Sequence, residues 1–316
     1  LYMDIKAFKM DGLGNDFVII DQRHKEFDLT NNQIKKICNR DFIGCDQLIV
    51  IKKSPFDYLK EKFDPDILTE IHSKLDDDNK IKSDNIKNIH EYLTNINASL
   101  KFYNSDGSTS GACGNGTRCV AYLLGSENNK DKITFWIDGK IVPSEILDDK
   151  NYIGTTLGTP KTEWYEIPLS KEFDTSNLKY KILDKNNNEY FGGIAINVGN
   201  PHVIFFLENI DNFNLEKIGP KIENDKLFPE KCNVTLAKKI NDKLIKVKVW
   251  ERGAGLTKAC GTAACATAVA ANLDHLRNSS TNIEFSLGKL TIEIDEDNKI
   301  HMFGPVSDIK EINFKI

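Results

Sequence analysis

Residues 259–272 read ACGTAACATAVAAN, and residues 112–125 read ACGNGTRCVAYLLG. Each stretch begins with Ala-Cys-Gly and continues in a pattern typical of a short helix. Earlier in each half of the chain, a Gly-Asn pair precedes an apolar run, in GNDFVI at residues 14–19 and in GNPHVI at residues 199–204. Gly-Asn with a strand, followed later by Ala-Cys-Gly with a helix, therefore occurs twice, which indicates an internal duplication.

The two Ala-Cys-Gly stretches predict helices that begin directly after a cysteine. Thr262–Asn272 is small and apolar on nearly every side, so this helix is expected to be buried all round. Its counterpart, Asn115–Leu124, is expected to end at Gly125, because glycine is a common C-terminal cap. Runs that alternate apolar with polar residues, such as Ile245–Trp250 and Leu290–Ile294, predict antiparallel strands with one solvated face. We expect an α+β fold with two pseudo-symmetric domains, each a curled, mostly antiparallel sheet around a central helix.

The length of the chain, 316 residues, suits two domains at roughly 150 residues each. Together with the duplication, it predicts an N-terminal half over residues 1–156 and a C-terminal half over residues 157–304. The last strand, at residues 305–316, is expected to return to the N-terminal half.

One segment of the first half has no counterpart in the second. Cys113 follows Asn15 by 98 residues (113 − 15), whereas Cys260 follows Asn200 by 60 residues (260 − 200). The excess lies in residues 52–99, which are rich in Lys, Asp, Asn and Ile and interrupt two strand-like runs. We predict a helical hairpin on the surface; a disordered insert is the alternative, because the segment is highly charged and poor in aromatic residues.

The composition excludes several classes of protein. The chain has 42 basic and 47 acidic side chains and a net charge of −5, whereas a protein that neutralises nucleic-acid phosphates needs clustered positive charge. The apolar runs have the length of strands, well short of the roughly 20 residues that span a bilayer. The amino terminus has no apolar signal core, and the seven cysteines do not suggest a disulfide framework. We expect a cytoplasmic protein with free thiols and no nucleic-acid or membrane partner.

The chemistry is expected at the two repeated cysteines, Cys113 and Cys260. A helix N-terminus carries unpaired N–H groups and a partial positive charge, which lower the pKa of a thiol and can also hold a carboxylate. If both sulfurs reach one carbon acid, a thiolate removes a proton from one face and a thiol delivers a proton to the other. The carbon is inverted, and this scheme requires no metal and no cofactor.

The other cysteines are interpreted as packing residues. A single Cys-Gly before a helix is weak evidence of function, but two at matching points of a repeat are much stronger. Zinc sites use gaps of two to four residues between ligands, with His nearby. Here Cys119 follows Cys113 by six residues and Cys265 follows Cys260 by five, which does not suit zinc. A redox or metal-binding protein nevertheless stays the alternative from another class. The cysteines assigned to packing are Cys38, Cys45, Cys119, Cys232 and Cys265.

Glu251-Arg252 precedes Cys260 at the end of a strand, in a chain with only five arginines. An arginine beside a glutamate there indicates recognition of a carboxylate through two hydrogen bonds, with a surface ion pair as the alternative. His202 follows Gly-Asn-Pro in the repeat and is expected near the site, although a buried core histidine would also suit that position.

Five motifs together resemble the diaminopimelate epimerase family, in order and over nearly the whole chain apart from the insert. The resemblance implies a cofactor-independent isomerase that interconverts LL- and meso-diaminopimelate, on the route to lysine and peptidoglycan. It also implies the two-domain fold shared with proline racemase and the phenazine-biosynthesis isomerases. The motifs are FKMDGLGNDF at residues 8–17, NSDGS at 104–108, CGNGTRC at 113–119, GNPH at 199–202 and ERGAGLTKACGT at 251–262.

The same resemblance assigns roles to single residues. Cys113 and Cys260 would be the acid/base pair, with His202 and Glu251 as modulators of their pKa values. Glu251 would also take an ammonium group of the substrate. The backbone amides expected to hold the reacting carboxylate are those of Gly114, Asn115, Gly261 and Thr262. The side chains expected to bind the distant amino-acid end are those of Asn15, Gln47, Asn104, Asn200, Asn233 and Arg252.

The carboxyl-terminal tail departs from the family pattern. The family carries an aromatic residue for dimerisation after Gly-Pro, whereas here Gly304-Pro305 leads to residues 309–311, Ile-Lys-Glu. A homodimer is expected by the resemblance, but without that contact. A racemase or isomerase of the same fold that acts on another amino acid stays the alternative; Arg252 and the asparagines favour a substrate with a second charged end over proline.

Overall fold

The computed structural model describes residues 3–55, 57, 95–111, 113–147 and 151–316. Strand β3 ends at Lys52 and β4 begins at Ala98. The helical hairpin expected between them lies almost wholly outside the described residues.

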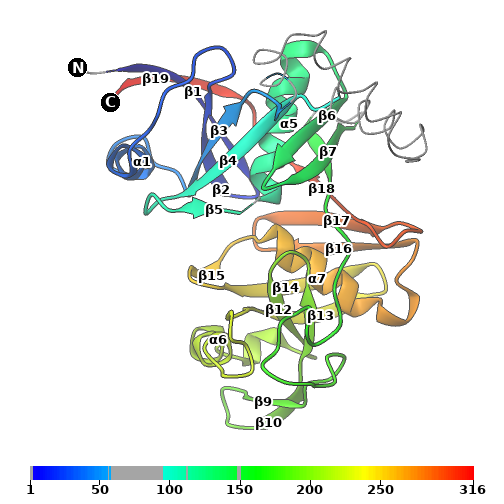
Figure 1. Ribbon diagram of the computed structural model, residues 1–316. Coiled ribbons are helices and arrows are strands. Elements are labelled where there is room, and N and C mark those ends of the chain that lie inside the picture. Colours follow the sequence, from blue (N-terminus) through cyan, green and yellow to red (C-terminus); the bar gives the residue numbers. More distant parts are fainter. Residues whose placement is uncertain (1–2, 56, 58–94, 112, 148–150) are drawn as a thin grey trace, which may run out of the picture. The chain divides into compact units, whose positions relative to one another are not determined.

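The contacts divide the chain into two compact units. The first unit contains residues 1–10, 16–147 and 307–316, and the second contains residues 11–15 and 148–306. In the first unit the last strand, β19, pairs antiparallel with β1, so that both ends of the chain lie together (Figure 1). In the second unit β8 pairs antiparallel with β18. The contacts therefore group β8 with the second unit, although the sequence suggests a boundary after residue 156.

The first unit is one mixed sheet with two described helices. Strand β2 pairs parallel with β3, and β4 pairs parallel with β6; β3–β4, β4–β5 and β6–β7 are antiparallel. Helix α5 contacts β6 and β7 (Figure 1). The elements are β1 (Asp4–Gly12), β2 (Asn15–Asp21), α1 (Asn31–Cys38), β3 (Gln47–Lys52), β4 (Ala98–Asn104), β5 (Thr109–Ser110), α5 (Gly114–Asn128), β6 (Lys132–Ile137), β7 (Lys140–Ile146) and β19 (Lys310–Lys315).

The first turn of α5 lies very close to the sheet. A Cβ atom at Gly116 would lie 2.7 Å from Ile49 Cδ1, 3.0 Å from Phe102 Cε1 and 3.1 Å from Phe17 Cε1. Because real Cβ contacts are longer than this, only glycine allows the helix to start so near the strands. This contact positions the residue at the start of the helix, Cys113.

The predicted end of α5 at Gly125 is wrong, because the helix continues to Asn128. Asn129 adopts the left-handed conformation (φ 48°) and its N–H donates to the Gly125 carbonyl, which closes the helix three residues later. Asparagine tolerates this conformation better than most residues. Gly125 itself serves packing, since a side chain there would clash with Ile146.

The second unit repeats this arrangement around α7. Strands β12–β13 and β14–β16 are parallel, and the other described pairs of its main sheet are antiparallel. The elements are β8 (Tyr152–Thr156), β9 (Tyr180–Leu183), β10 (Glu189–Gly192), β11 (Ile194–Asn197), β12 (Pro201–Phe206), η1 (Ile210–Asn212), α6 (Leu215–Glu223), β13 (Asn233–Asn241), β14 (Leu244–Glu251), β15 (Gly255–Thr257), α7 (Gly261–Ala271), η2 (Leu273–His275), β16 (Ser279–Phe285), β17 (Gly288–Ile294) and β18 (Ile300–Pro305).

The expectation that the helix after Cys260 is buried all round is confirmed. Every residue from Ala263 to Ala270 is buried, and the helix contacts β11, β12, β13, β16, β17 and β18 (Figure 1). Alanine side chains allow strands to approach the helix on all sides, and larger side chains from the strands, such as Ile283 and Met302, fill the remaining space. The structure confirms the α+β fold of two curled sheets, each with a buried helix.

The duplication extends to the register of the strands. In the first unit Phe17 pairs with Gln47 across the parallel strands β2 and β3. In the second unit His202 pairs with Asn233 across the parallel strands β12 and β13. Since Phe17 and His202 occupy the same place in the sequence repeat, Gln47 and Asn233 are structurally equivalent positions. Sequence comparison alone shows no similarity between the segments that carry them.

A short strand precedes each repeated cysteine in the same way. Strand β5 pairs with β4 and ends at Ser110, three residues before Cys113. Strand β15 pairs with β14 and ends at Thr257, three residues before Cys260. Each cysteine therefore follows the returning strand of a hairpin and starts the central helix of its unit.

Candidate functional site

Cys113 and Cys260 are the N-cap residues of α5 and α7, as the sequence predicts. Both have extended backbones, with φ −108° and ψ 115° at Cys113 and φ −142° and ψ 114° at Cys260, and neither helix has a side-chain cap. Helices α1 and α6, in contrast, are capped by Thr30 and Asn214, whose side chains accept hydrogen bonds from first-turn amides. The Cys113 and Cys260 side chains therefore do not occupy the first-turn amides of their helices, and helix N-termini of this kind suit an anion such as a carboxylate.

The backbone fixes both cysteines firmly. The N–H and hydroxyl of Thr117 both donate to the Cys113 carbonyl, at 2.8 and 2.9 Å, and the Ala264 N–H donates to the Cys260 carbonyl at 3.1 Å. Cys113 is half-buried and Cys260 is 7% exposed. The Cys260 sulfur lies 3.5 Å from the Thr262 hydroxyl.

In the first unit, a hydrogen-bond chain joins two of the predicted binding residues. Gln47 Nε2 donates to Asn104 Oδ1 at 3.1 Å and to Ser110 Oγ at 3.0 Å. Asn104 Nδ2 donates to Ser108 Oγ at 3.1 Å, and that hydroxyl donates to Asp106 Oδ1 at 2.5 Å. Gln47 and Asn104 are thus held at adjacent strand ends. Sequence reasoning missed Ser110, although its place three residues before Cys113 was a usable signal.

In the second unit, a chain of polar contacts runs from His202 to Cys260. His202 Nε2 lies 2.8 Å from Asn200 Oδ1, an acceptor, and 3.4 Å from Asn233 Nδ2, a donor; the shorter contact favours the tautomer with the proton on Nε2. Asn200 Nδ2 then donates to Thr262 Oγ1 at 3.4 Å. The Thr262 hydroxyl in turn lies within hydrogen-bond distance of the Cys260 sulfur, and either atom can be the donor in this contact. The chain thus links the buried His202 to the Cys260 sulfur through Asn200 and Thr262.

Asn233 joins this chain to the loop that carries Arg252. Its Nδ2 donates to the Pro201 carbonyl at 2.9 Å, and its Oδ1 accepts from the Arg252 N–H at 2.9 Å. The Arg252 side chain is exposed, and its Nη1 donates to the Glu230 carbonyl at 2.8 Å. The structure thus brings Asn200, Asn233 and Arg252 together at one end of the second sheet.

Glu223, a residue that sequence reasoning missed, holds the Glu251-Arg252 turn. Its carboxylate is 6% exposed and accepts from Trp250 Nε1 at 2.8 Å and from the Gly253 N–H at 2.9 Å. These two donors flank the Glu251-Arg252 pair on both sides. No local signal marks Glu223, because it ends α6 in a segment where charged residues are frequent.

The remaining candidates occupy different environments. Asn15 starts β2 and belongs, with the turn before it, to the second unit, where Leu13 packs into the core around α7. The Asn115 side chain is buried and accepts from Arg118 Nη2 at 2.8 Å. The role predicted for Asn115, to hold the reacting carboxylate, therefore concerns its backbone amide and not its side chain. Gly261 is the first residue of α7.

His202 is completely buried, and this burial predicts a pH-dependent stability. Burial, with the charge of Arg252 as a second cause, lowers the pKa of His202 from 6.5 to about 3. Within the described residues Nδ1 has no hydrogen-bond partner, so a second proton would be a buried, unsatisfied charge. The folded protein keeps His202 neutral, whereas the unfolded chain binds a proton below pH 6.5. Stability therefore falls as the pH drops from 6.5 toward 3, by up to about 1.4 kcal/mol per pH unit.

The expected result is that the free energy of unfolding in urea decreases by about 1.6 kcal/mol more between pH 6.5 and pH 5 in the wild type than in His202→Gln. The variant also controls for other groups that titrate in this range, because they are common to both proteins. Equal pH dependence of the two proteins would show that His202 is not buried in the neutral form.

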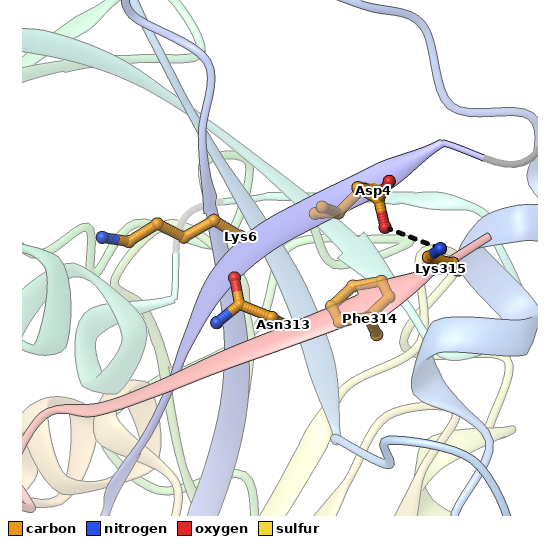
Figure 2. Close-up of a pocket in the computed structure, with 6 residues that line it drawn as sticks. Asp4, Lys6, Asn313, Phe314 and Lys315 are labelled. Carbon is orange, nitrogen blue, oxygen red and sulfur yellow. Dashed lines mark ion pairs between the residues drawn. The ribbon is translucent and has the colours of Figure 1, made fainter.

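A surface hollow on the first unit is lined by none of these residues. It is lined by Asp4, Ile5, Lys6, Asn313, Phe314 and Lys315 on the paired strands β1 and β19 (Figure 2). Asp4 and Lys315 form an ion pair at 3.6 Å across it, and both side chains are largely exposed. Exposed pairs of this kind contribute little to stability or binding, and the hollow contains none of the site residues predicted from the sequence.

Comparison with known proteins identifies the family. The family model described as diaminopimelate epimerase matches residues 7–163 and 194–309. The diaminopimelate epimerase of Pelagibacter ubique is 59% identical over 314 residues, which cover 99% of this chain and 100% of that protein. The chain belongs to the diaminopimelate epimerase family. The resemblance predicted from the five motifs is therefore confirmed.

Solved structures confirm the fold at much lower sequence identity. A phenazine biosynthesis protein of the PhzF family from Bacillus anthracis has a TM-score of 0.62 at 14% identity, with 99% of this chain and 100% of that chain covered. A hydroxyproline epimerase from Agrobacterium vitis has a TM-score of 0.61 at 9% identity, with coverages of 99% and 93%. At these identities the similarity establishes the fold alone.

The described part of the chain lacks two features typical of other kinds of protein. No helix in it is long and apolar enough to cross a membrane. In the same residues, no three or more His, Cys, Asp or Glu side chains come together as a metal-binding group.

Proposed function

We propose that this chain is an isomerase that interconverts LL- and meso-2,6-diaminopimelate by acid/base chemistry at Cys113 and Cys260, without a cofactor. The activity and the substrate follow from membership of the family and from the 59% identity to a diaminopimelate epimerase over nearly the whole chain. The observation that supports the two cysteines as the acid/base pair is their equivalent N-cap position at two buried helices without side-chain caps.

The proposed reaction begins with one cysteine as thiolate and the other as thiol. The thiolate accepts the proton on the substrate Cα, and the thiol delivers its proton to the opposite face of the same carbon. The configuration is inverted, and the protonation states of the two sulfurs are exchanged. The pair returns to its starting state by proton exchange with solvent, so that no oxidant, reductant or metal takes part.

The uncapped helix starts supply the electrostatic stabilisation that this reaction needs. When the Cα proton leaves, negative charge flows into the adjacent carboxylate. We infer that the backbone amides of Gly114 and Asn115, and of Gly261 and Thr262, hold this carboxylate. Amides that are fixed before the reaction stabilise the developing charge without reorganisation, and such donors contribute about 3–4 kcal/mol in comparable sites.

The distant end of diaminopimelate carries its own carboxylate and ammonium group. Arg252 suits the carboxylate and Glu251 suits the ammonium, and Glu223 holds the turn that carries them both. The neutral amides complete the set, because each offers both a donor and an acceptor to a zwitterion. The proposed binding amides are Asn15, Gln47, Asn104, Asn200 and Asn233.

We propose that His202 acts on Cys260 indirectly, through Asn200 and Thr262. A neutral imidazole that donates to Asn200 fixes the orientation of that amide and thus of the Thr262 hydroxyl. Glu251 stays a predicted modulator of the cysteines. In this proposal the halves over residues 1–156 and 157–304 each supply one sulfur. The enzyme works in the cytoplasm as a homodimer, and sedimentation analysis would test its oligomeric state.

The direct test is turnover of LL-diaminopimelate by the reduced protein without added cofactor, beside L-proline and L-hydroxyproline. Formation of meso-diaminopimelate supports the proposal. Turnover confined to the prolines would instead support the alternative of another racemase of this fold, since a hydroxyproline epimerase shares it. Zinc or iron at near-stoichiometric amounts in the fresh protein, without turnover, would support the metal-binding alternative.

A second result follows from the solvent exchange of the thiols. In deuterated water, the product is expected to carry deuterium at the inverted carbon, because its new proton comes from a thiol equilibrated with solvent. Mass spectrometry of the product at low conversion measures this label. Unlabelled product would contradict two solvent-exchanged bases, and the recovered substrate at low conversion serves as the control for non-enzymatic exchange.

A further inference from the structure

An ion cluster lies beside the predicted binding amides Asn15 and Gln47. Lys9 Nζ is at its edge, 3.7 Å from Asp16 Oδ2, and three other side chains form its centre. Arg40 Nη1 and Nη2 donate to Asp16 Oδ2 and Oδ1 at 2.6 and 2.8 Å, and Nη2 also donates to Asp46 Oδ1 at 2.7 Å. A bidentate guanidinium of this kind fixes both distance and orientation. We call Arg40, Asp16 and Asp46 the Arg40 cluster.

The two carboxylates of the Arg40 cluster also join two strands to each other. The Asp16 N–H donates to Asp46 Oδ2 at 3.0 Å, and the Asp46 N–H donates to both Asp16 Oδ1 and the Asp16 carbonyl at 3.0 Å. Each carboxylate thus accepts from the backbone of the other residue. This reciprocal pattern fixes the start of β2 against the start of β3.

The position of the cluster in the sequence connects it to binding. Asp16 directly follows Asn15, and Asp46 directly precedes Gln47. In the parallel pair β2–β3, Gln47 lies opposite Phe17. Any change in the spacing of Asp16 and Asp46 would therefore move Asn15 and Gln47 relative to one another.

Two carboxylates this close repel one another unless a cation holds them. Burial alone would raise the pKa of Asp16, but the hydrogen bonds and charge of Arg40 lower it below its ordinary value. Arg40 therefore keeps the Asp16 carboxylate ionised, and its charge offsets the repulsion between Asp16 and Asp46. The Arg40 side chain is 58% exposed, whereas that of Asp16 is 19% exposed. Solvent access limits what the cluster adds to global stability.

The second unit shows that the fold itself does not require such a cluster. There the equivalent positions before His202 and Asn233 are Pro201 and Cys232. The strands β12 and β13 are joined at that place by Asn233 Nδ2, which donates to the Pro201 carbonyl. A cluster that one unit has and its equivalent lacks points to a task particular to the first unit.

We propose that Arg40 is a positioning residue for substrate binding, whose guanidinium holds Asp16 and Asp46 together and so sets the spacing of Asn15 and Gln47. This inference rests on the proposed role of these two amides in binding diaminopimelate. Arg40 itself takes no part in proton transfer. Its loss should therefore weaken binding without slowing the chemical step.

The experiment measures KM and kcat for LL-diaminopimelate in Arg40→Gln and Arg40→Lys. Arg40→Gln is expected to raise KM by about 3–30-fold, equivalent to one or two weakened substrate hydrogen bonds, with kcat within about threefold of wild type. Arg40→Lys keeps the positive charge but cannot form the bidentate hydrogen bonds of the guanidinium. Its KM should therefore lie between those of the wild type and of Arg40→Gln.

The matched control is Arg23→Gln, because Arg23 makes the same kind of pair at the other end of β2. Its Nε and Nη2 donate to both oxygens of Asp21, and Nη2 also donates to Glu127. Arg23→Gln should leave KM unchanged, whatever it does to Tm. A shift in Tm without a shift in KM for Arg40→Gln would show that Arg40 has only a structural role.

A double variant tests the cause. If repulsion between the carboxylates displaces the amides, Asp46→Asn should restore the KM of Arg40→Gln to within about threefold of wild type, a clearly non-additive result. Unchanged KM in both Arg40 variants, with an active wild type, overturns the inference and leaves the proposed function intact. A wild type that does not turn over LL-diaminopimelate would instead overturn the proposed function.

Discussion

Cys113→Ala and Cys260→Ala each lower kcat for epimerisation of LL-diaminopimelate by about 10²–10⁴-fold or more, because each removes one of the two proton-transfer groups. Inversion needs removal of a proton on one face and delivery on the other, so neither sulfur replaces its partner. The initial rate of formation of meso-diaminopimelate measures the effect. Cys119→Ala and Cys265→Ala are the matched controls, because these cysteines lie buried inside the same two helices.

The single variants also separate the two half-reactions. A variant with one remaining cysteine can still remove and return a proton on one face, so it should exchange the Cα hydrogen of one stereoisomer with deuterated water without inverting it. Cys113→Ala and Cys260→Ala should do so with opposite isomers. Full inversion by either variant would contradict the two-cysteine mechanism, whereas loss of activity in both control variants would point to general damage to the helices.

Phe102→Ala lowers the free energy of unfolding of the first unit by about 3–5 kcal/mol, the usual cost of removing a buried phenylalanine ring from a packed core. Phe102 is 1% exposed, and its ring lies against the first turn of α5 at Gly116. The cavity left by the ring would lie against the first turn of α5, the helix whose N-cap is Cys113. A loss of stability at this place should therefore be accompanied by a lower kcat.

Hydrogen exchange of peptides from α5 measures this effect locally, and urea unfolding measures it for the whole chain. Protection of α5 should decrease at least about 100-fold. Phe42→Ala is the control in the same unit, because this ring is 40% exposed and contacts Phe314 only edge-on. Its cost should be at most about 1 kcal/mol. Similar costs for the two variants would mean that Phe102 does not support α5.

The helices and cysteines of the candidate site were predictable because their signals are local. The alanine-rich pattern of residues 261–271 allows only a helix buried on all sides, and Ala-Cys-Gly marks its start within three residues. The strands β3, β12 and β14 were likewise recognisable from runs of a few apolar or alternating residues. Even here the boundary of α5 was wrong, because Asn129 competes with Gly125 as the left-handed cap and local sequence does not rank the two.

The partners of these residues were not predictable, because they come from strands that meet only in the folded sheet. Glu223 reaches Trp250 and Gly253 from 27 and 30 residues away, and Arg40 reaches Asp16 from 24 residues away. Which side chains meet depends on strand register, and a shift of one residue would turn each side chain to the other face. Hydrophobic periodicity predicts a strand but not the residue that lies opposite it.

The amino-acid sequence by itself determined the duplicated α+β architecture, the two helices that begin directly after a cysteine, and the family, since all of these depend on patterns within short segments. Only the tertiary structure decided what surrounds each sulfur and each binding amide: the chain from His202 through Asn200 and Thr262 to Cys260, the turn held by Glu223 and the Arg40 cluster. The physical reason is that the apolar pattern of a helix lies in neighbouring residues of the chain, whereas hydrogen bonds between strands depend on how the strands pair in the folded sheet.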